Sequence, residues 1–221
     1  DKQGKFALGI GGYVRATGEY DFGGIVDDID FVPANIPSIS KIKNQFQMDA
    51  STATIFLKLV GHTRLLGDFT VYTAGNFRGG DKTFQLRNAY MSFRNITVGY
   101  TYGGFMDLGA LPSTIDFQGP NGATFYRATQ LSYTYKGLKD FRFLSFHRGG
   151  LAVDGTTSSQ FEIAQQRMPG LHSFGTIQLE QQQSFACRRY HPQHDIYQHG
   201  KGQGSSVTGY GVQASTTFNL R

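Results

Sequence analysis

The sequence predicts an all-β protein that folds as an antiparallel up-and-down transmembrane β-barrel, and three observations lead to this prediction. First, 19 Phe, 12 Tyr and 29 Gly occur among 221 residues. Glycine at this density disfavours helices, because each internal Gly costs a helix about 1 kcal/mol relative to Ala. Second, apolar and polar residues alternate over segments of about ten residues, the length of a strand that crosses a membrane. Third, short connections alternate with long ones, as they do in such barrels.

The composition also excludes several classes of protein. No run of about 18 apolar residues exists, so a transmembrane helix is not expected. The lone Cys187 excludes an internal disulfide framework and a four-cysteine zinc site. The formal charge of +5 is not clustered into basic runs, which argues against nucleic acid as a partner and fits a weakly anion-attracting surface or pore. No basic and apolar leader precedes Asp1, so we expect any signal peptide to be absent from this chain.

The first expected strand runs from Lys5 to Tyr20. Its apolar residues, among them Phe6, Leu8, Ile10 and Val14, lie on one face, and polar residues and Gly lie on the other. A long loop with an acidic cluster follows over residues 21–43, and a second strand is expected at 46–60.

The next elements alternate in the same way. Strands are expected at 66–77, 84–93, 96–102 and 125–135, with short links at 62–65, 79–81, 94–95 and 136–140. The segment 103–122 shows no alternation. A soluble sandwich would have turns of similar length at both ends, so the sequence favours the membrane barrel. A soluble or surface β-sandwich binding module is the alternative.

Three stretches together resemble a known family, the DcaP-like outer-membrane porins. They are LGDFTVYTAGNFRGG (Leu66–Gly80), LRNAYMSF (Leu86–Phe93) and GGFMDLGALPSTIDFQGPNG (Gly103–Gly122). The resemblance covers roughly residues 6–143 and resumes at 207–220. It implies a closed barrel of about sixteen strands in the bacterial outer membrane, in contact with its lipid and assembled as a homotrimer. It also implies passive diffusion of small anionic solutes such as dicarboxylates, with no enzymatic activity and no cofactor. A structural barrel that is not a channel is a further alternative.

The chain departs from this family in its length. At about 20 residues for each strand and its connection, 221 residues supply about ten strands. The chain also ends in Arg221 instead of a terminal aromatic residue. We therefore expect residues 1–221 to form a single domain that amounts to half to two-thirds of a porin-type barrel.

Several side chains are candidates for the wall of the pore. Arg15 and Arg78 lie on the polar face of their strands, and Arg87 lies on the neighbouring strand. Inside a pore, such arginines raise the local anion concentration. Tyr13 and Tyr72 lie on the same polar faces. The alternatives are solvated or interfacial arginines and tyrosines of an interfacial girdle; Arg127 lies on a face that the pattern leaves ambiguous.

The segment 103–122 is expected to be an inward loop that constricts the pore. Its candidate residues are Phe105, Asp107, Asp116 and Phe117, and either carboxylate would pair with a wall arginine. The alternative is an exposed outer loop with ordinary turn chemistry at its Gly-Pro-Asn-Gly end.

Two stretches, 144–151 and 170–200, break the alternation and are expected to be irregular. The second contains Cys187, His191 and His194, which superficially resemble a metal site. We interpret both stretches as translated out of frame, because one codon choice, read one nucleotide later, gives strand-like sequence (VSIEAA in the first, HLRVAGIIRSMTYINM in the second). No metal is expected.

Overall fold

The structure is a computed structural model of the chain. It describes residues 6–22, 29, 44–103, 106, 108–109, 111–114, 117, 119–120, 127–135, 141–147, 161–179, 183–198, 203–208 and 211–218. The chain forms two compact units. The first comprises Asp1–Gly61, Thr70–Ala89 and Leu111–Ala123, and the second comprises His62–Phe69, Tyr90–Ala110 and Thr124–Arg221.

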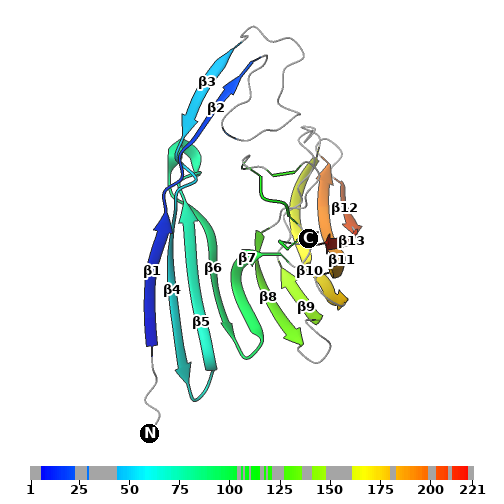
Figure 1. Cartoon of the computed structure of the whole chain (residues 1–221). Helices are drawn as coiled ribbons and strands as arrows, with labels where there is room; N and C mark the ends of the chain where they lie inside the picture. Colours follow the sequence, from blue (N-terminus) through cyan, green and yellow to red (C-terminus); the bar gives the residue numbers. More distant parts are fainter. Residues whose placement is uncertain are drawn as a thin grey trace. The chain divides into compact units, whose positions relative to one another are not determined.

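The described residues form strands joined by turns, and the strand pairs described below are antiparallel (Figure 1). An 11-stranded sheet has the order β1-β4-β5-β6-β7-β8-β9-β10-β11-β12, with β13 also paired to β11, and β2 pairs with β3 in a separate ribbon. Among the described residues, no pairing joins β1 to the last strands, so the barrel is not closed. The all-β antiparallel prediction is confirmed, including its incomplete barrel. The strands are β1 (Phe6–Tyr13), β2 (Thr17–Asp21), β3 (Gln45–Asp49), β4 (Thr54–Thr63), β5 (Gly67–Asn76), β6 (Gln85–Phe93), β7 (Ile96–Tyr102), β8 (Arg127–Tyr135), β9 (Phe141–His147), β10 (Phe161–Leu179), β11 (Gln183–Gln198), β12 (Gln203–Thr208) and β13 (Gly211–Phe218).

The only helical turn in the described part of the chain is the short 3-10 helix η2 (Gly80–Lys82). None of the described residues belongs to a helix with the length and apolar character needed to cross a membrane.

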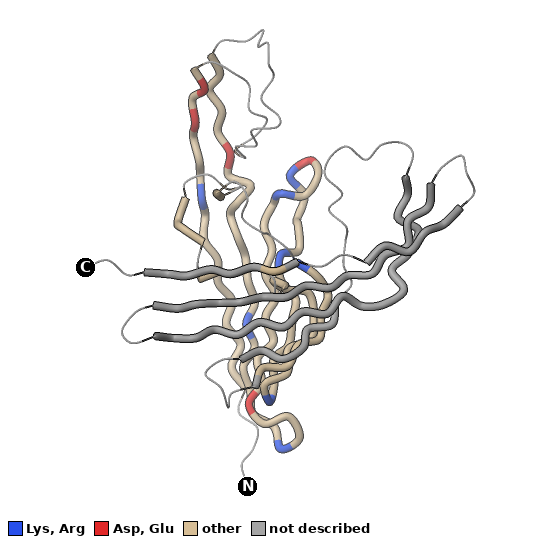
Figure 2. Tube along the Cα trace, turned by 90° about the vertical axis from the view of Figure 1, so that its right-hand side faces the viewer, with Lys and Arg blue, Asp and Glu red and all other residues tan. Residues whose placement is uncertain are grey.

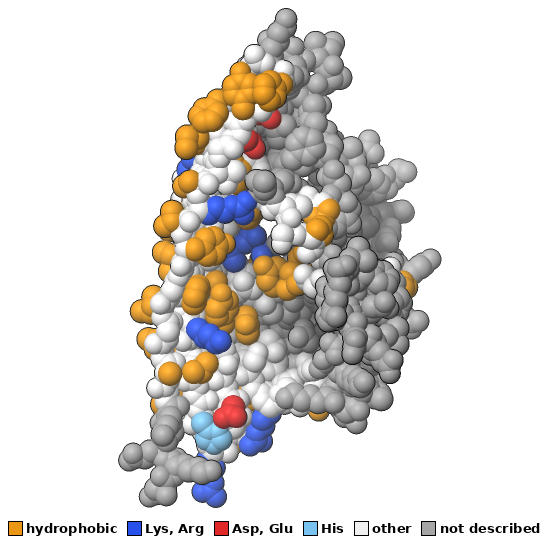
Figure 3. All heavy atoms as spheres, viewed as in Figure 1, with side chains coloured by type: hydrophobic (Ala, Val, Ile, Leu, Met, Phe, Trp, Pro, Cys, Tyr) orange, Lys and Arg blue, Asp and Glu red, His pale blue; other side chains and the backbone are white. Residues whose placement is uncertain are grey.

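The first strand pair has one face of apolar residues and a second face that mixes small, polar and aromatic residues. Leu8 lies opposite Leu59 and Ile10 opposite Leu57, and directly paired residues share a face. Leu8 is 65% exposed and Ile10 is 73% exposed, as lipid-facing side chains would be. Figure 3 shows such hydrophobic side chains along the edge formed by β1. Residues on the other face of β1, such as Ala7 and Tyr13, are exposed as well, so the outward orientation of the apolar face stays a prediction.

The first two expected strands are each interrupted in the structure. The segment 5–20 is two strands, β1 and β2, and the segment 46–60 is β3 and β4. The cause is a tight turn at residues 50–53, where the Ala53 N–H donates to the Ala50 carbonyl at 3.0 Å. Residues 14–16 lie opposite this turn and outside the strands, so β2 and β3 continue as a separate ribbon beyond β1 and β4 (Figure 1).

The four strands expected from residue 66 to residue 135 match β5, β6, β7 and β8 within two residues at each end. The link between β6 and β7 is the tight turn at Arg94 and Asn95, both of which have positive φ. The β7–β8 pair is antiparallel, with Val98 opposite Leu131.

The expectation of irregular backbone in the two later stretches is wrong. Residues 144–147 belong to β9, and residues 170–179 and 183–198 belong to β10 and β11. Strand pairing uses backbone groups that every residue except Pro possesses, so it does not require alternation. One shift in the β10–β11 register spans Pro169, between Met168 and Leu171, and Pro192 is skipped in the pairing. Pro cannot donate to the ladder. The out-of-frame interpretation concerns the coding DNA and stays a hypothesis.

Candidate pore-wall site

Arg78 follows β5 at a turn that is bonded to its neighbours. The Phe77 N–H donates to the Ser51 carbonyl at 2.8 Å, and the Arg78 N–H donates to Asn76 Oδ1 at 3.3 Å. By strand alternation Arg78 continues the face of Tyr72, whose ring stacks on Phe56 with centroids 5.9 Å apart. Because β5 ends at Asn76, Arg78 lies beyond the strand, and its predicted place on the polar face stays a prediction.

Arg87 lies in β6 and is half-buried. Its Nη1 donates to Gln85 Oε1 at 3.4 Å, two residues earlier on the same face of the strand. A guanidinium has five N–H donors, so this bond uses only part of its capacity.

The ring of Phe117 brings the two arginines together. The Arg78 Cζ lies over this ring at 4.7 Å from its centroid, and the Arg87 Cζ lies over it at 5.4 Å. Both distances are within the range of cation–π attraction. All three residues belong to the first unit. Phe117, a residue of the 103–122 segment, therefore contacts one arginine that follows β5 and one that lies in β6.

Close to Phe117, Gly119 adopts a backbone conformation with positive φ. Gly119 has a φ of +78°, a conformation that costs a residue with a Cβ free energy and suits Gly. A Cβ at this position would lie 4.0 Å from Thr114 Oγ1, so the described residues on the two sides of Phe117 approach each other.

The other predicted site residues are placed as follows. Tyr13 ends β1, is 58% exposed and pairs with Thr54, on the face that carries Gly11 and Phe56. Arg15 lies in the link between β1 and β2 and is half-buried. Phe105, Asp107 and Asp116 lie outside the described residues, as does the predicted pairing of either carboxylate with a wall arginine.

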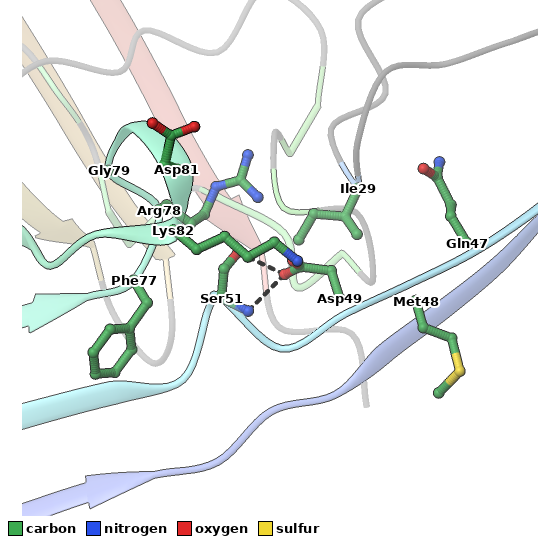
Figure 4. A pocket seen from close by; sticks show the side chains of 10 residues that line it. All are labelled: Ile29, Gln47, Met48, Asp49, Ser51, Phe77, Arg78, Gly79, Asp81 and Lys82. Carbon is green, nitrogen blue, oxygen red and sulfur yellow. Dashed lines mark hydrogen bonds and ion pairs between the residues drawn. The ribbon is translucent and has the colours of Figure 1, made fainter.

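A second cluster, at Asp49, was not anticipated from the sequence. Asp49 is 8% exposed, and its Oδ2 accepts from the Ser51 N–H at 2.7 Å and from Ser51 Oγ at 2.6 Å. Its Oδ1 lies 3.4 Å from Lys82 Nζ. These groups line a cleft of about 400 Å³, in which the side chains of Lys82 and Ser51 point toward Asp49 (Figure 4).

The ionisation of Asp49 reflects two opposing effects. Burial raises its pKa, while the hydrogen bonds from Ser51 and the nearby Lys82 lower it, and the net pKa lies below the ordinary value. Asp-x-Ser is a turn signal that could have indicated the Ser51 contact, but Lys82 is too distant in sequence to be found in that way. Figure 2 shows further acidic positions on the β2–β3 ribbon.

In the second unit, the structure shows on which face of its strand Arg127 lies, which the sequence pattern left open. It pairs with Tyr102, donates from Nη2 to the Tyr102 hydroxyl at 2.6 Å, and lies over that ring at 4.3 Å from the centroid. The same face carries Leu131 and Tyr133, which are 48% and 44% exposed. Arg127 therefore ends an exposed apolar face.

His62 also has a partner that the sequence did not suggest. Its Nδ1 lies 2.7 Å from Asp68 Oδ1, with the two side chains 51% and 96% exposed. Such an exposed pair contributes little to stability.

The antiparallel sheet and its exposed apolar residues define the class of fold, which is an antiparallel β-barrel that is incomplete in this chain. Among solved structures, this chain is similar to the outer membrane channel DcaP of Acinetobacter baumannii, with a TM-score of 0.83 and 20% sequence identity. The match covers 98% of this chain and 60% of that protein. The chain therefore has a DcaP-like fold and spans 60% of the length of the structure that it matches. No family model matches the sequence, and no curated protein does.

Proposed function

We propose that this chain is part of a porin of the bacterial outer membrane that passes small anionic solutes, dicarboxylates among them, by passive diffusion. The observation that carries the proposal is the convergence of Arg78 and Arg87 on Phe117. Two guanidinium groups on the wall of a water-filled barrel attract anions and lower their entry barrier.

The membrane location is supported by the exposed apolar residues on one face of the strands. Leu8, Ile10 and Leu57 show this face in the first unit, and Val98 and Leu131 show it in the second, with exposures between 42% and 73%. Water disfavours a continuous apolar face, whereas lipid accommodates it. A trimer, the absence of catalysis and the absence of a cofactor are further parts of the proposal, supported by the likeness of fold alone.

The test is ion selectivity of the full-length protein in planar bilayers. One unit charge about 4 Å away is worth roughly 4 kcal/mol at an effective dielectric near 20, and salt with a Debye length of about 8 Å screens much of this. We therefore expect anion preference without exclusion of cations. The double variant Arg78→Gln/Arg87→Gln should move the zero-current potential in a salt gradient toward cation preference.

The control is Arg94→Gln, which removes one positive charge, half of the change in the double variant, from the turn between β6 and β7. It should leave the potential within a few millivolts of the wild-type value. An unchanged potential in the double variant would remove these arginines from the selectivity mechanism. A protein that is extracted without detergent would favour the β-sandwich module, and a detergent-requiring protein with no conductance would favour a structural barrel.

A further inference from the structure

We infer that Phe117 is a positioning residue for anion recognition, because its ring contacts the guanidinium groups of both Arg78 and Arg87 and holds them within reach of one dianionic solute. The inference rests on the proposed function and goes beyond it, since it assigns the geometry of the arginine pair to an uncharged side chain.

The chemistry of the contact explains how a ring can fix two cations and leave them active. An aromatic face attracts the positive charge through its quadrupole. It does not replace the N–H donors, which lie in the guanidinium plane and bind carboxylates in pairs. The contact with Phe117 therefore adds no negative charge beside Arg78 or Arg87.

The distances make joint action on one solute possible. With 4.7 Å and 5.4 Å to a common centroid, the two Cζ atoms are at most about 10 Å apart, close to the Debye length at 0.1 M salt. Two carboxylates of one small solute can reach both groups within such a span. An arginine side chain loses rotamer entropy when it is immobilised, and a contact made before the solute arrives reduces that cost.

The contact can be distinguished from ordinary apolar packing by the choice of substitution. Phe117→Leu keeps apolar volume and removes the aromatic quadrupole, whereas Phe117→Tyr keeps the ring. Leu108, a described residue of the 103–122 segment that is 51% exposed, offers the control Leu108→Ala.

The first measurement is block of chloride current through the full-length protein by succinate. Cation–π contacts of this kind correspond to about a three- to tenfold change in affinity. Phe117→Leu should raise the succinate concentration for half-block by this factor and leave half-block by acetate nearly unchanged, since acetate engages one guanidinium. Phe117→Tyr should restore the wild-type value, and Leu108→Ala should keep it.

The second measurement does not depend on transport. In detergent micelles, the Nε–Hε NMR signals of the two arginines, assigned with Arg78→Lys and Arg87→Lys, should carry an upfield ring-current shift. Phe117→Leu should abolish this shift and Phe117→Tyr should preserve it. Each variant is first checked for folding by its heat-modifiable mobility in gels.

The outcomes separate the inference from the proposed function. Unchanged succinate block in Phe117→Leu, or arginine signals that do not move, would overturn the positioning role even in an anion-selective channel. Equal weakening of succinate and acetate block would overturn the joint recognition of a dianion. A wild-type channel without anion preference that still shows the ring-current shift would overturn the proposed function while supporting the arginine–ring contact.

Discussion

At the scale of single residues, Asp49 connects three segments of the first unit. It ends β3, accepts two hydrogen bonds from Ser51 in the turn, and lies 3.4 Å from Lys82 Nζ in η2. A buried carboxylate is stable only when such partners compensate for its lost hydration. Asp49 therefore stabilises the turn that ends the ribbon and begins β4.

Replacement of Asp49 by Ala should lower the free energy of unfolding by about 1 to 3 kcal/mol, because the buried Ser51 N–H loses its acceptor. The measurement is urea unfolding in detergent micelles. The control is Asp81→Asn in η2, whose side chain is exposed and whose substitution should change stability by less than about 0.5 kcal/mol. Equal effects of the two substitutions would contradict the role of Asp49.

The same carboxylate predicts a pH dependence. Because folding lowers the pKa of Asp49 below its ordinary value of 3.8, the ionised group contributes stability above that pH. This contribution is lost as the pH falls below 3.8 and through the lowered pKa. The difference in the free energy of unfolding between Asp49→Ala and the wild type should therefore become smaller when the same unfolding experiment is repeated in acid.

At the scale of elements, glycines allow β1 and β4 to approach closely. The ring of Phe56 covers Gly11, and a Cβ at Gly12 would collide with the backbone oxygen of Thr54. At Gly9 the nearest atom to a Cβ is the Lys58 oxygen, at an ordinary 3.7 Å. The three glycines of one strand are thus unequal in what they tolerate.

We expect Gly12→Ala to destabilise the protein by about 1 to 3 kcal/mol, as overpacking does. Gly9→Ala should be neutral or slightly stabilising, because it removes backbone freedom from the unfolded chain at a position with room for a methyl group. The measurement is the unfolding midpoint of each variant in the same detergent, and Gly12→Ala should have the lower midpoint. A Gly12→Ala variant as stable as Gly9→Ala would show that the strands can separate without cost.

At the scale of the whole molecule, the exposed apolar face is expected to contact lipid. Adjacent residues of β1 lie on opposite faces of the sheet. Leu8 is on the apolar face with Leu59, and Ala7 is on the other face with Val60. A charge introduced at these two positions should therefore have different consequences.

In the full-length protein, Leu8→Arg should make the free energy of folding into lipid vesicles less favourable by up to about 2 to 4 kcal/mol. This is the cost of Arg near the middle of a bilayer. Ala7→Arg should have little effect, because its side chain would face the water-filled interior. The folded fraction after urea dilution into vesicles measures both. An equal decrease in the folded fraction of the two variants would mean that the apolar face does not contact lipid.

The sequence alone determined the all-β class, the alternation along β1 and the positions of β5 to β8, because alternation and turn residues are local signals. It also placed Arg78, Arg87 and Phe117 among the candidates. Only the tertiary structure decided that one ring meets both arginines, that Asp49 meets Lys82, and that Arg127 lies on the apolar face. These facts depend on which strands become neighbours and in what register, and periodicity within a strand does not contain that information. The same limit explains β9 to β11, where pairing with neighbouring strands forms the sheet although the local sequence does not alternate.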